Sequence, residues 1–406
     1  MINIKKLIEQ LSTLNLIVFF AGFDLVTSLA SLFLSDIAEH SQLVTIPFRA
    51  FSLLLSIIVL VLNLKNKINT NLSILCLFFY LSLLIIRLLY DFGLRTDIDT
   101  FRSDRTQVVL LFSSMIINTL ATAKSYKNIN FTLVFKYILL LYSIILVINF
   151  ITVQEFTLES ALIQTQVSAG LRNTIATGYI AATFILISLF YYTKGINLSV
   201  YKLILIPVII IAIIILLRAG SRGPLLSVFI GIIIYFAFRN RNPLKIIIYS
   251  VLLLALAVLF YEDIISSIIK VSPIMADRIE FTLAEGDKLR MEYFNAGIEG
   301  FLNNPFTGSY AFVYTPFEWY EYPHQLVIES FMATGILGGI ALIIVLFGVI
   351  KIIIINIQNK TPNLWIELIA ITYVVRALTA GSIYFGEYPI IFILILLAQS
   401  KNITYR

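Results

Sequence analysis

The sequence has little charge, almost no cysteine and few histidines for its length. Of its 406 residues, 13% are charged, about half the share of a typical soluble domain, while 59% are hydrophobic. This composition excludes a soluble globular protein. The single cysteine, Cys76, excludes a disulfide framework and a cysteine-ligated metal site. The net charge of +6 is small and dispersed along the chain, which argues against nucleic acid as a partner.

Sequence motifs for nucleotides and metals are also missing. The sequence contains no P-loop, no glycine-rich dinucleotide fingerprint and no array of His, Cys and Asp with metal-ligand spacing. We therefore expect no cofactor and no metal. An enzyme of this kind would need a donor that is already activated and is carried in the membrane.

The hydrophobic residues fall in blocks of the length that a helix needs to cross a bilayer core of about 30 Å. Between them lie short polar loops, without the alternating pattern of an outer-membrane barrel. We predict an all-α, polytopic membrane protein with one membrane domain over residues 1–406. Twelve spans are expected at roughly 14–34, 44–64, 71–90, 107–123, 132–152, 174–193, 201–217, 224–238, 246–260, 325–350, 362–380 and 385–399.

Basic residues predict the orientation of these spans. With the N-terminus inside, the inner loops are short and carry 13 lysines and 3 arginines, as the positive-inside rule requires. Both termini are then cytoplasmic. Of the other 13 basic residues, 11 are arginines, whose planar side chain suits phosphate or carboxylate better than lysine does. Pairing with the outer acidic residues is the alternative role for each of them.

The outer loops are unequal in length. Loop 91–106 has alternating charges, which is typical of a solvated, self-paired face. Loop 153–173 is polar and contains Arg172. Loop 261–324 is the longest, with 64 residues, and includes an amphipathic stretch over 289–303. Its helical periodicity places Arg290, Phe294, Gly297 and Phe301 on one face.

The segment 217–224 joins two spans with almost no loop and contains Arg218 and Arg222. The following span is only 15 residues, about 22 Å long, so these arginines are expected below the outer headgroup level. Ser221 is a plausible N-cap, and an arginine beside a helix N-terminus can form an anion site. The alternative is a tight turn with snorkelling arginines. We favour the anion site, because two partly buried arginines without an anion are costly.

One of the two histidines stands out. His40 lies in a short outer loop and is expected to be solvated, whereas His324 ends the longest loop and opens a long apolar run. A helix N-terminus disfavours the imidazolium, so a histidine there stays neutral and can accept a proton. Glu329 falls in the first turns of the same helix. A purely structural histidine remains the alternative.

Seven aromatic residues precede His324. They form either an interfacial belt or a platform on which sugar rings stack. Position alone favours the belt. The cluster comprises Tyr310, Phe312, Tyr314, Phe317, Trp319, Tyr320 and Tyr322.

Three ordered segments together resemble the O-antigen polymerase and O-antigen ligase family. They are Ser221-Arg222-Gly223 at the start of a helix, residues 290–308, and residues 323–338, which include Pro323-His324-Gln325. The order, the spacing and the long outer loop between the ninth and tenth spans match this family. The resemblance covers roughly 203–340. Gln325 stands where the family often has Asn, and it keeps the amide.

The resemblance implies glycosyl transfer on the periplasmic side of the bacterial inner membrane, without metal or cofactor. The donor would be an oligosaccharide on undecaprenyl diphosphate, and a second lipid-linked repeat unit would be the acceptor. Arg222 and Arg290 would bind the diphosphate and His324 would act as the general base. Further substrate contacts would come from Arg172, Arg218, Arg278, Glu329 and Tyr322. A chain-length regulator and a flippase would be functional partners.

The acceptor separates a polymerase from a ligase, which transfers the glycan to the lipid A core. We favour the polymerase from the Tyr-Pro-His segment and the chain length. A lipid-linked oligosaccharide flippase also has about twelve spans. Flippases tend to show related halves and no dominant outer loop, whereas this chain has no visible internal repeat and one dominant loop.

Overall fold

The computed structural model describes most of the chain. The described residues are 4–33, 37–68, 70–93, 105–152, 174–193, 199–219, 221–239, 288–314, 320–321, 323–379 and 387–399, with three single positions between 239 and 288.

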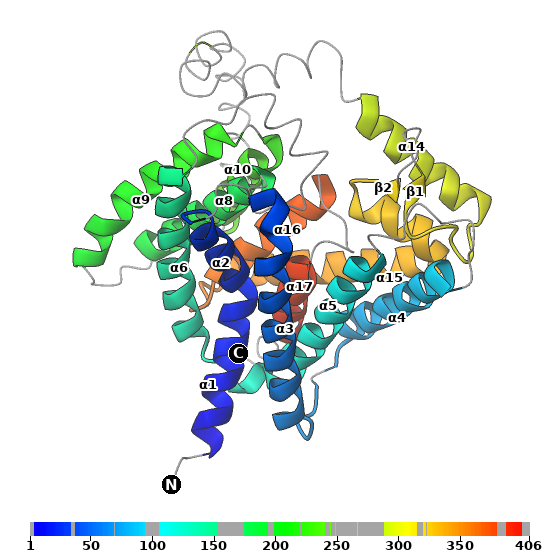
Figure 1. The fold of residues 1–406 in the computed structure, drawn as a ribbon, viewed down its shortest axis with the longest axis horizontal. Helices are drawn as coiled ribbons and strands as arrows, with labels where there is room; N and C mark the ends of the chain where they lie inside the picture. Colours follow the sequence, from blue (N-terminus) through cyan, green and yellow to red (C-terminus); the bar gives the residue numbers. More distant parts are fainter. Residues whose placement is uncertain are drawn as a thin grey trace. The chain divides into compact units, whose positions relative to one another are not determined.

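The described chain is almost entirely helical (Figure 1). The helices of its N-terminal part are α1 (Ile4–Ile17), a π-helical segment η1 (Val18–Gly22), α2 (Phe23–Ala30), α3 (Ile37–Leu62), α4 (Leu72–Gly93), α5 (Arg105–Ser125), the 3-10 turn η3 (Tyr126–Asn128) and α6 (Phe131–Thr152). Then follow α8 (Thr174–Thr193), α9 (Ser199–Arg218), α10 (Arg222–Arg239), α14 (Lys288–Asn303), the strands β1 (Val313–Tyr314) and β2 (Tyr320–Glu321), α15 (Leu326–Gln358), α16 (Trp365–Thr379) and α17 (Glu387–Gln399).

These helices confirm the predicted fold class. Eleven of the twelve expected spans coincide with a helix, and the span expected at 246–260 lies outside the described residues. Seven of the described helical segments are long and apolar enough to cross a membrane, and 205–218 and 390–399 are shorter apolar helices. The protein is therefore a polytopic membrane protein. The count of twelve spans remains a prediction.

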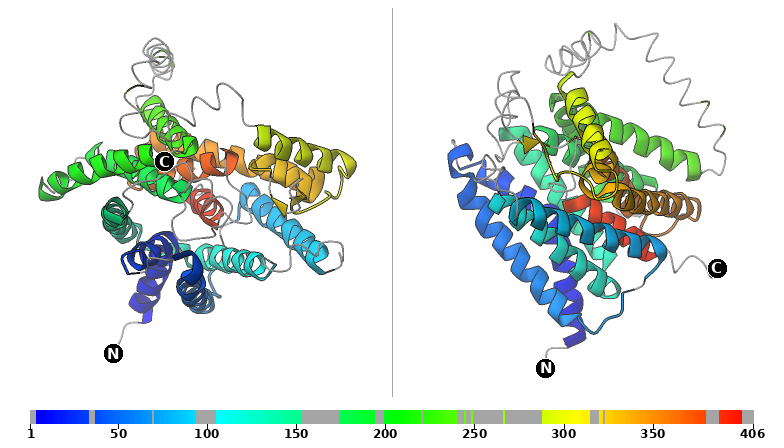
Figure 2. Two further views of the ribbon diagram at one scale, coloured as in Figure 1. Left: turned by 45° about the horizontal axis from the view of Figure 1, so that its top comes forward. Right: turned by 90° about the vertical axis from the view of Figure 1, so that its right-hand side faces the viewer.

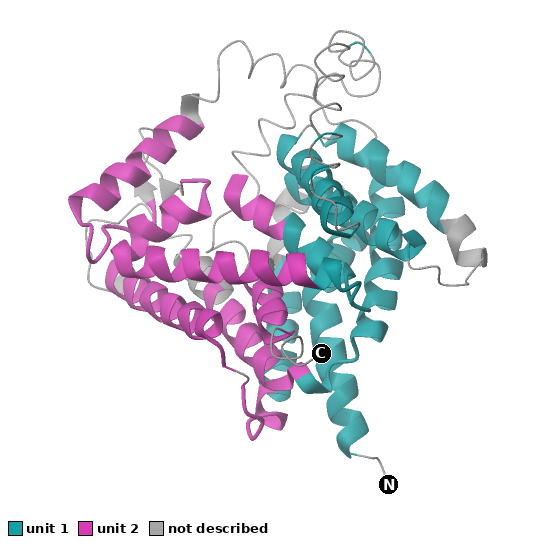
Figure 3. Ribbon diagram, turned by 180° about the vertical axis from the view of Figure 1, so that it is seen from behind, with its two compact units in different colours: residues 1–59, 127–284, 356–372 teal, residues 60–126, 285–355, 373–406 magenta. Residues whose placement is uncertain are grey.

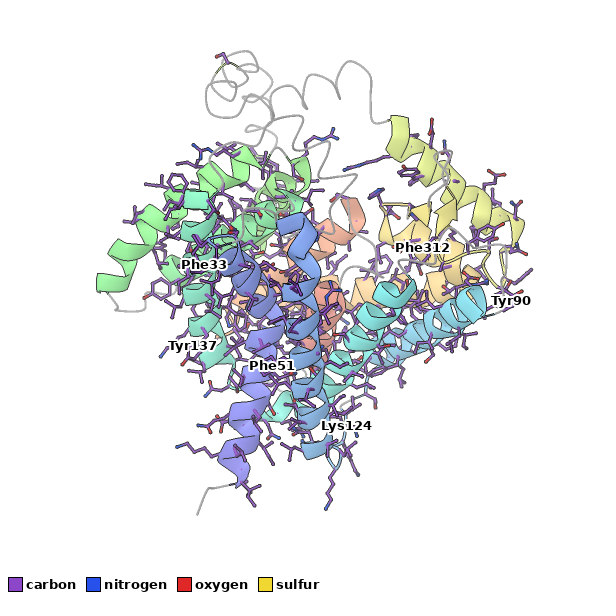
Figure 4. All side chains as sticks on the ribbon, in the orientation of Figure 1. Phe33, Phe51, Tyr90, Lys124, Tyr137 and Phe312 are labelled. Carbon is purple, nitrogen blue, oxygen red and sulfur yellow. The ribbon has the colours of Figure 1, made fainter. Side chains whose placement is uncertain are left out.

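Large apolar side chains point outward from the spanning helices. Phe51 on α3, Tyr90 on α4 and Tyr137 on α6, all labelled in Figure 4, are exposed on the described chain. On a soluble protein this much exposed apolar surface would mark an interface or an aggregation risk. On a membrane protein it is the surface that meets the lipid chains.

Side-chain amides begin several of these helices. Asn71 Oδ1 accepts a hydrogen bond from Ile74 N at 2.8 Å before α4, and Asn130 Oδ1 accepts one from Leu133 N at 3.1 Å before α6. Each amide satisfies one of the N–H groups that a helix start leaves without an intrahelical partner. Asn71 also donates to the carbonyl of Leu397 at 2.9 Å, which ties the start of α4 to the end of α17.

The chain divides into two compact units, coloured separately in Figure 3. Unit 1 comprises 1–59, 127–284 and 356–372. Within it α8 packs on α9 and α10, and α6 packs on α2, α8 and α9. A Cβ at Gly178 of α8 would lie 2.9 Å from Pro224 Cγ and 3.2 Å from Ala219 Cβ. The glycine thus allows α8 to approach the junction between α9 and α10 closely.

Unit 2 comprises 60–126, 285–355 and 373–406. Here α17 packs against α4 and α5, and α14 packs against β1. The two strands form a short antiparallel hairpin in which Val313 pairs with Glu321. The views in Figures 1 and 2 show α14, the hairpin and the beginning of α15 beside one another. The longest predicted outer loop therefore contains regular structure.

The sequence predicts one continuous helix for the apolar run after His324, but the structure shows an interrupted one. Gly335 has φ 67° and ψ −166° and interrupts α15 after its first nine residues, 326–334. A Cβ at this position would overlap the carbonyl oxygen of Phe306. The remaining 23 residues, 336–358, are about 35 Å long and span the bilayer core by themselves. The first segment is therefore expected at or beyond the membrane surface.

The orientation can be tested by thiol labelling in a Cys76→Ser background. Lys65 and Asn359 are exposed positions on the predicted cytoplasmic side, and Asn303 is an exposed position at the end of α14. In spheroplasts, a membrane-impermeant maleimide should label a cysteine at Asn303 and leave cysteines at Lys65 and Asn359 unlabelled until the membrane is opened. The reverse pattern would place α14 in the cytoplasm and contradict the proposed orientation.

Candidate functional site

The candidate site begins where the chain enters α15. His324 has φ 56°, in the left-handed region that non-glycine residues rarely adopt, and its side chain is half-buried. Gln325 follows, and its Oε1 accepts a hydrogen bond from Ile328 N at 2.6 Å. This amide therefore caps α15. Gln325 therefore keeps the helix start in place directly after the histidine.

Helix α14 packs against this turn through its Tyr293 face. The rings of Tyr293 and His324 stack with centroids 5.7 Å apart and an interplanar angle of 28°. One turn further along, Gly297 is buried, and a Cβ there would lie 2.9 Å from Pro323 Cγ and 2.8 Å from Ile328 Cγ2. A glycine at this position lets α14 approach the histidine turn to backbone contact.

The predicted amphipathic helix over 289–303 is confirmed, with a correction to its buried face. Tyr293, Gly297 and Gly300 are buried, whereas Phe294 and Phe301 are half-buried. Phe301 contacts Phe331 of α15, with ring centroids 5.1 Å apart. The sequence pattern placed the face one position away from its true centre.

Arg290 lies one turn before Tyr293 on α14. It is half-buried, and its Nη1 donates to the carbonyl oxygen of Thr379 at 3.4 Å. Thr379 is the last residue of α16. The structure thus brings two of the predicted site residues, Arg290 and His324, into one unit and onto neighbouring elements.

Glu329 is fully buried, with none of its surface exposed, and lies one helical turn after Gln325 on α15. Its backbone N–H donates to the Gln325 carbonyl at 3.0 Å. Burial of this carboxylate favours a role in holding the start of α15 over a direct contact with a sugar.

Arg218 and Arg222 belong to unit 1 and flank the junction of α9 and α10. Arg218 is the last residue of α9, and its guanidinium lies 5.5 Å from the ring centre of Phe150, a cation–π contact. Arg222 is the first residue of α10 and is half-buried. Helix α10 comprises 18 residues and is long and apolar enough to cross a membrane, so the prediction of a 15-residue span at this position is wrong. Its shared site with Arg290 and His324 stays a prediction.

Three predicted site residues, Arg172, Arg278 and Tyr322, lie outside the described residues, as does the side chain of His40. Of the aromatic cluster, Tyr310 is exposed and Phe312, labelled in Figure 4, is buried. Phe312 therefore packs inside unit 2 and is not part of a sugar platform. The side chains of the other five aromatic residues also lie outside the described part of the chain.

Sequence reasoning missed a charged pair on α4. Asp91 was assigned to a solvated, self-paired loop, and this assignment is wrong. Its carboxylate is buried, its Oδ2 accepts a hydrogen bond from Ala311 N at 2.7 Å, and its Oδ1 lies 3.3 Å from Arg87 Nη1. An arginine inside an apolar span, four residues before an aspartate, is the signal that could have identified the pair.

A family model described as O-Antigen ligase matches residues 206–343, about a third of the chain. The matched segment contains Arg218, Arg222, Arg290, His324 and Glu329, and it excludes Arg87 and Arg172. No curated protein matches the sequence.

Two glycines on the same face of α14 provide a matched test of its packing. Gly297→Ala places a methyl group against the rigid Pro323 ring, whereas Gly300→Ala meets only the flexible Met332 side chain, at 3.1 Å. We expect Gly297→Ala to cost about 1–3 kcal/mol of stability. In Gly300→Ala the gain in helix propensity, about 0.5–1 kcal/mol, offsets the contact. Equal losses of thermal stability in the two purified variants would contradict a close approach at Gly297.

Proposed function

We propose that the protein is an O-antigen polymerase, from the premise that residues 206–343 match the family model described as O-Antigen ligase. It transfers a growing glycan from undecaprenyl diphosphate to the non-reducing end of another lipid-linked repeat unit. The observation that carries this proposal is the contact of α14 with the His324 turn. That contact brings a candidate base and a candidate phosphate-binding arginine together inside the segment that matches the family.

The reaction needs a proton acceptor on one side of the anomeric carbon and stabilised negative charge on the other. The acceptor hydroxyl attacks the anomeric carbon, the C–O bond to the diphosphate breaks, and His324 takes the hydroxyl proton. A ring stacked on Tyr293 is restricted in orientation, which suits a base that must meet one hydroxyl.

The leaving diphosphate gains charge as the bond breaks, and arginines meet that charge best because the guanidinium can donate two parallel hydrogen bonds. We assign this role to Arg290 and Arg222, both half-buried in the structure. Arg172, Arg218, Arg278 and Tyr322 are proposed as further contacts to the diphosphate or the sugars. Glu329 is proposed to hold the histidine turn. No metal or cofactor is required in this scheme.

The acceptor distinguishes the polymerase from a ligase, whose product is glycan attached to the lipid A core. The Tyr322-Pro323-His324 segment and the chain length support the polymerase. A flippase is the alternative from another class. The single dominant outer loop and the lack of related halves count against it. We place the enzyme in the bacterial inner membrane, with its site on the periplasmic face and a flippase and a chain-length regulator as partners.

Deletion of the gene, followed by gel separation of the surface polysaccharide, tests this function. A polymerase predicts that the ladder collapses to core plus one repeat unit. Loss of all core-linked glycan, with lipid-linked polymer accumulating, would mean a ligase, and unpolymerised donor on the cytoplasmic face would mean a flippase.

Complementation of the deletion tests the proposed arginines. Arg290→Lys and Arg222→Lys keep the charge but lose the planar fork, so each should fail to restore the ladder at wild-type protein level. Lys127→Arg, on the predicted cytoplasmic side, serves as a control of the same chemistry and should restore it. A full ladder with Arg290→Lys would show that this residue supplies only charge or only structure.

A further inference from the structure

The interruption of α15 at Gly335 leaves backbone groups that need partners from elsewhere. Residues 304–311, here called the 304–311 loop, supply most of them. Ser309 N donates to the Met332 carbonyl at 2.8 Å, and Ile336 N donates to the Pro305 carbonyl at 2.7 Å. The loop therefore lies in the break and pairs with the helix on both sides of it.

Arg87 of α4 supplies the remaining partner. Its Nε donates to the Ala333 carbonyl at 2.9 Å, at the end of the first segment of α15. Its two Nη atoms donate to the carbonyls of Thr307, Gly308 and Ser309, at 2.7, 2.8 and 3.1 Å. The fifth bond goes to Asp91, at 3.3 Å. All five N–H donors of the guanidinium are therefore used.

Asp91 holds the same loop from the other end. One carboxylate oxygen accepts from Arg87 and the other accepts from Ala311 N. The side chains of Arg87 and Asp91 are only 11% and 4% exposed. An ion pair that is buried this far depends on good hydrogen-bond geometry to offset the cost of leaving water. The pair joins three separate elements, namely α4, the 304–311 loop and α15.

The loop in turn is fixed to the C-terminal end of α14. Ser309 Oγ donates to the Gly300 carbonyl at 2.5 Å, and Asn304 N donates to the Phe301 carbonyl at 3.2 Å. Within the loop, Asn304 Nδ2 donates to Ser309 Oγ at 2.9 Å and Gly308 N donates to the Asn304 carbonyl at 2.9 Å, so the loop residues are held to one another as well. A shift of the loop would therefore move α14, which carries Arg290 and Tyr293.

We propose that Arg87 and Asp91 are positioning residues for the transfer reaction, because they lock the 304–311 loop into the break of α15 and so hold α14 against His324. This inference rests on the proposed function. Arg87 acts through the loop and does not contact substrate, since each of its donors is already bound to a protein oxygen.

Arg87 and Asp91 together are here called the clamp. Variants of either residue should lose turnover without losing donor binding. Arg87→Ala removes all five bonds, and Arg87→Lys offers three donors without the planar fork. Misplacement of a catalytic group by about 1 Å can cost about 10²-fold in rate, so we expect a loss of that order in Arg87→Ala. Binding of undecaprenyl diphosphate to the purified protein in nanodiscs should stay within about threefold of wild type. Asp91→Asn is the milder variant if Arg87→Ala folds poorly.

Lys124 provides a matched control in the same unit. Its Nζ also donates to two loop carbonyls, those of Leu64 and Asn66, at 3.1 and 2.9 Å. It lies at the end of α5 and is labelled in Figure 4. Lys124→Ala should lower thermal stability while turnover per folded protein stays near wild type. An equal loss of turnover in Lys124→Ala would mean that the effect of Arg87 is only structural.

A disulfide can replace the clamp. A Cβ at Gly300 would lie 3.1 Å from Met332 Cγ, which is close to the separation of about 3 Å between a Cβ and the far sulfur in a disulfide. Gly300→Cys with Met332→Cys, in a Cys76→Ser background, should therefore join α14 to the first segment of α15. We expect oxidation to restore turnover of Arg87→Ala to within about tenfold of wild type, and reduction to abolish it again. A disulfide that forms without restoring turnover would overturn the proposal.

The rate of disulfide formation gives a readout that does not depend on activity. If the clamp holds the loop, Arg87→Ala should slow the oxidation of the 300–332 pair at least about fivefold. An unchanged or faster rate would overturn the positioning role, whatever the enzyme transfers. A wild-type protein without transferase activity would instead contradict the proposed function. The oxidation rate of the 300–332 pair would then still test whether Arg87 holds the loop in place.

Discussion

A break in a helix next to the membrane exposes backbone groups that the bilayer cannot satisfy, and α15 has such a break at Gly335. In a chain with few charges, one arginine and one short loop meet this need. The four backbone carbonyls bound by Arg87 come from the loop and from the end of the first segment of α15. Backbone N–H and C=O groups that are buried need hydrogen-bond partners, and here the protein itself supplies them. The 304–311 loop that fills the break is also joined to α14, so it determines where α14 lies against the histidine turn.

The first segment of α15 is fixed at both of its ends. Gln325 caps it after His324, and Gly335 ends it nine residues later, where Phe306 leaves no room for a side chain. The remaining length of α15 is enough to cross the bilayer core. The segment 326–334 is therefore not needed to span the membrane, and its N-terminal end can hold His324 outside the bilayer core. Gly297 brings α14 to that start at backbone distance.

The sequence predicted the helices well because their signal is local. Apolar blocks of spanning length predicted the positions of helices at eleven of the twelve expected spans, and the 3.6-residue period identified α14 within one residue. The features that the sequence pattern did not predict depend on contacts between positions far apart in the chain. Asp91 and Ala311 are 220 residues apart, and nothing near Asp91 in the sequence indicates a partner there. The break at Gly335 was hidden for the same reason, since the backbone that packs against this glycine belongs to Pro305 and Phe306, far from it in the sequence.

Most residues of the candidate site were predicted only through the resemblance to the O-antigen polymerase and ligase family. Physical reasoning alone identified His324 from its place before a helix and left its role open. The structure adds the stack of His324 on Tyr293, which lies one turn after Arg290 on α14, and this stack has no sequence signal of its own.

His324 is proposed to accept the proton of the attacking hydroxyl, and turnover, donor binding and thermal stability of purified His324→Ala test this role directly. Loss of a general base typically costs about 10²–10⁴-fold in rate. We expect a fall of that size with a small residual rate, while undecaprenyl diphosphate binding and the unfolding temperature stay near wild type. Turnover close to wild type, or a fall only in step with binding and stability, would contradict the assignment.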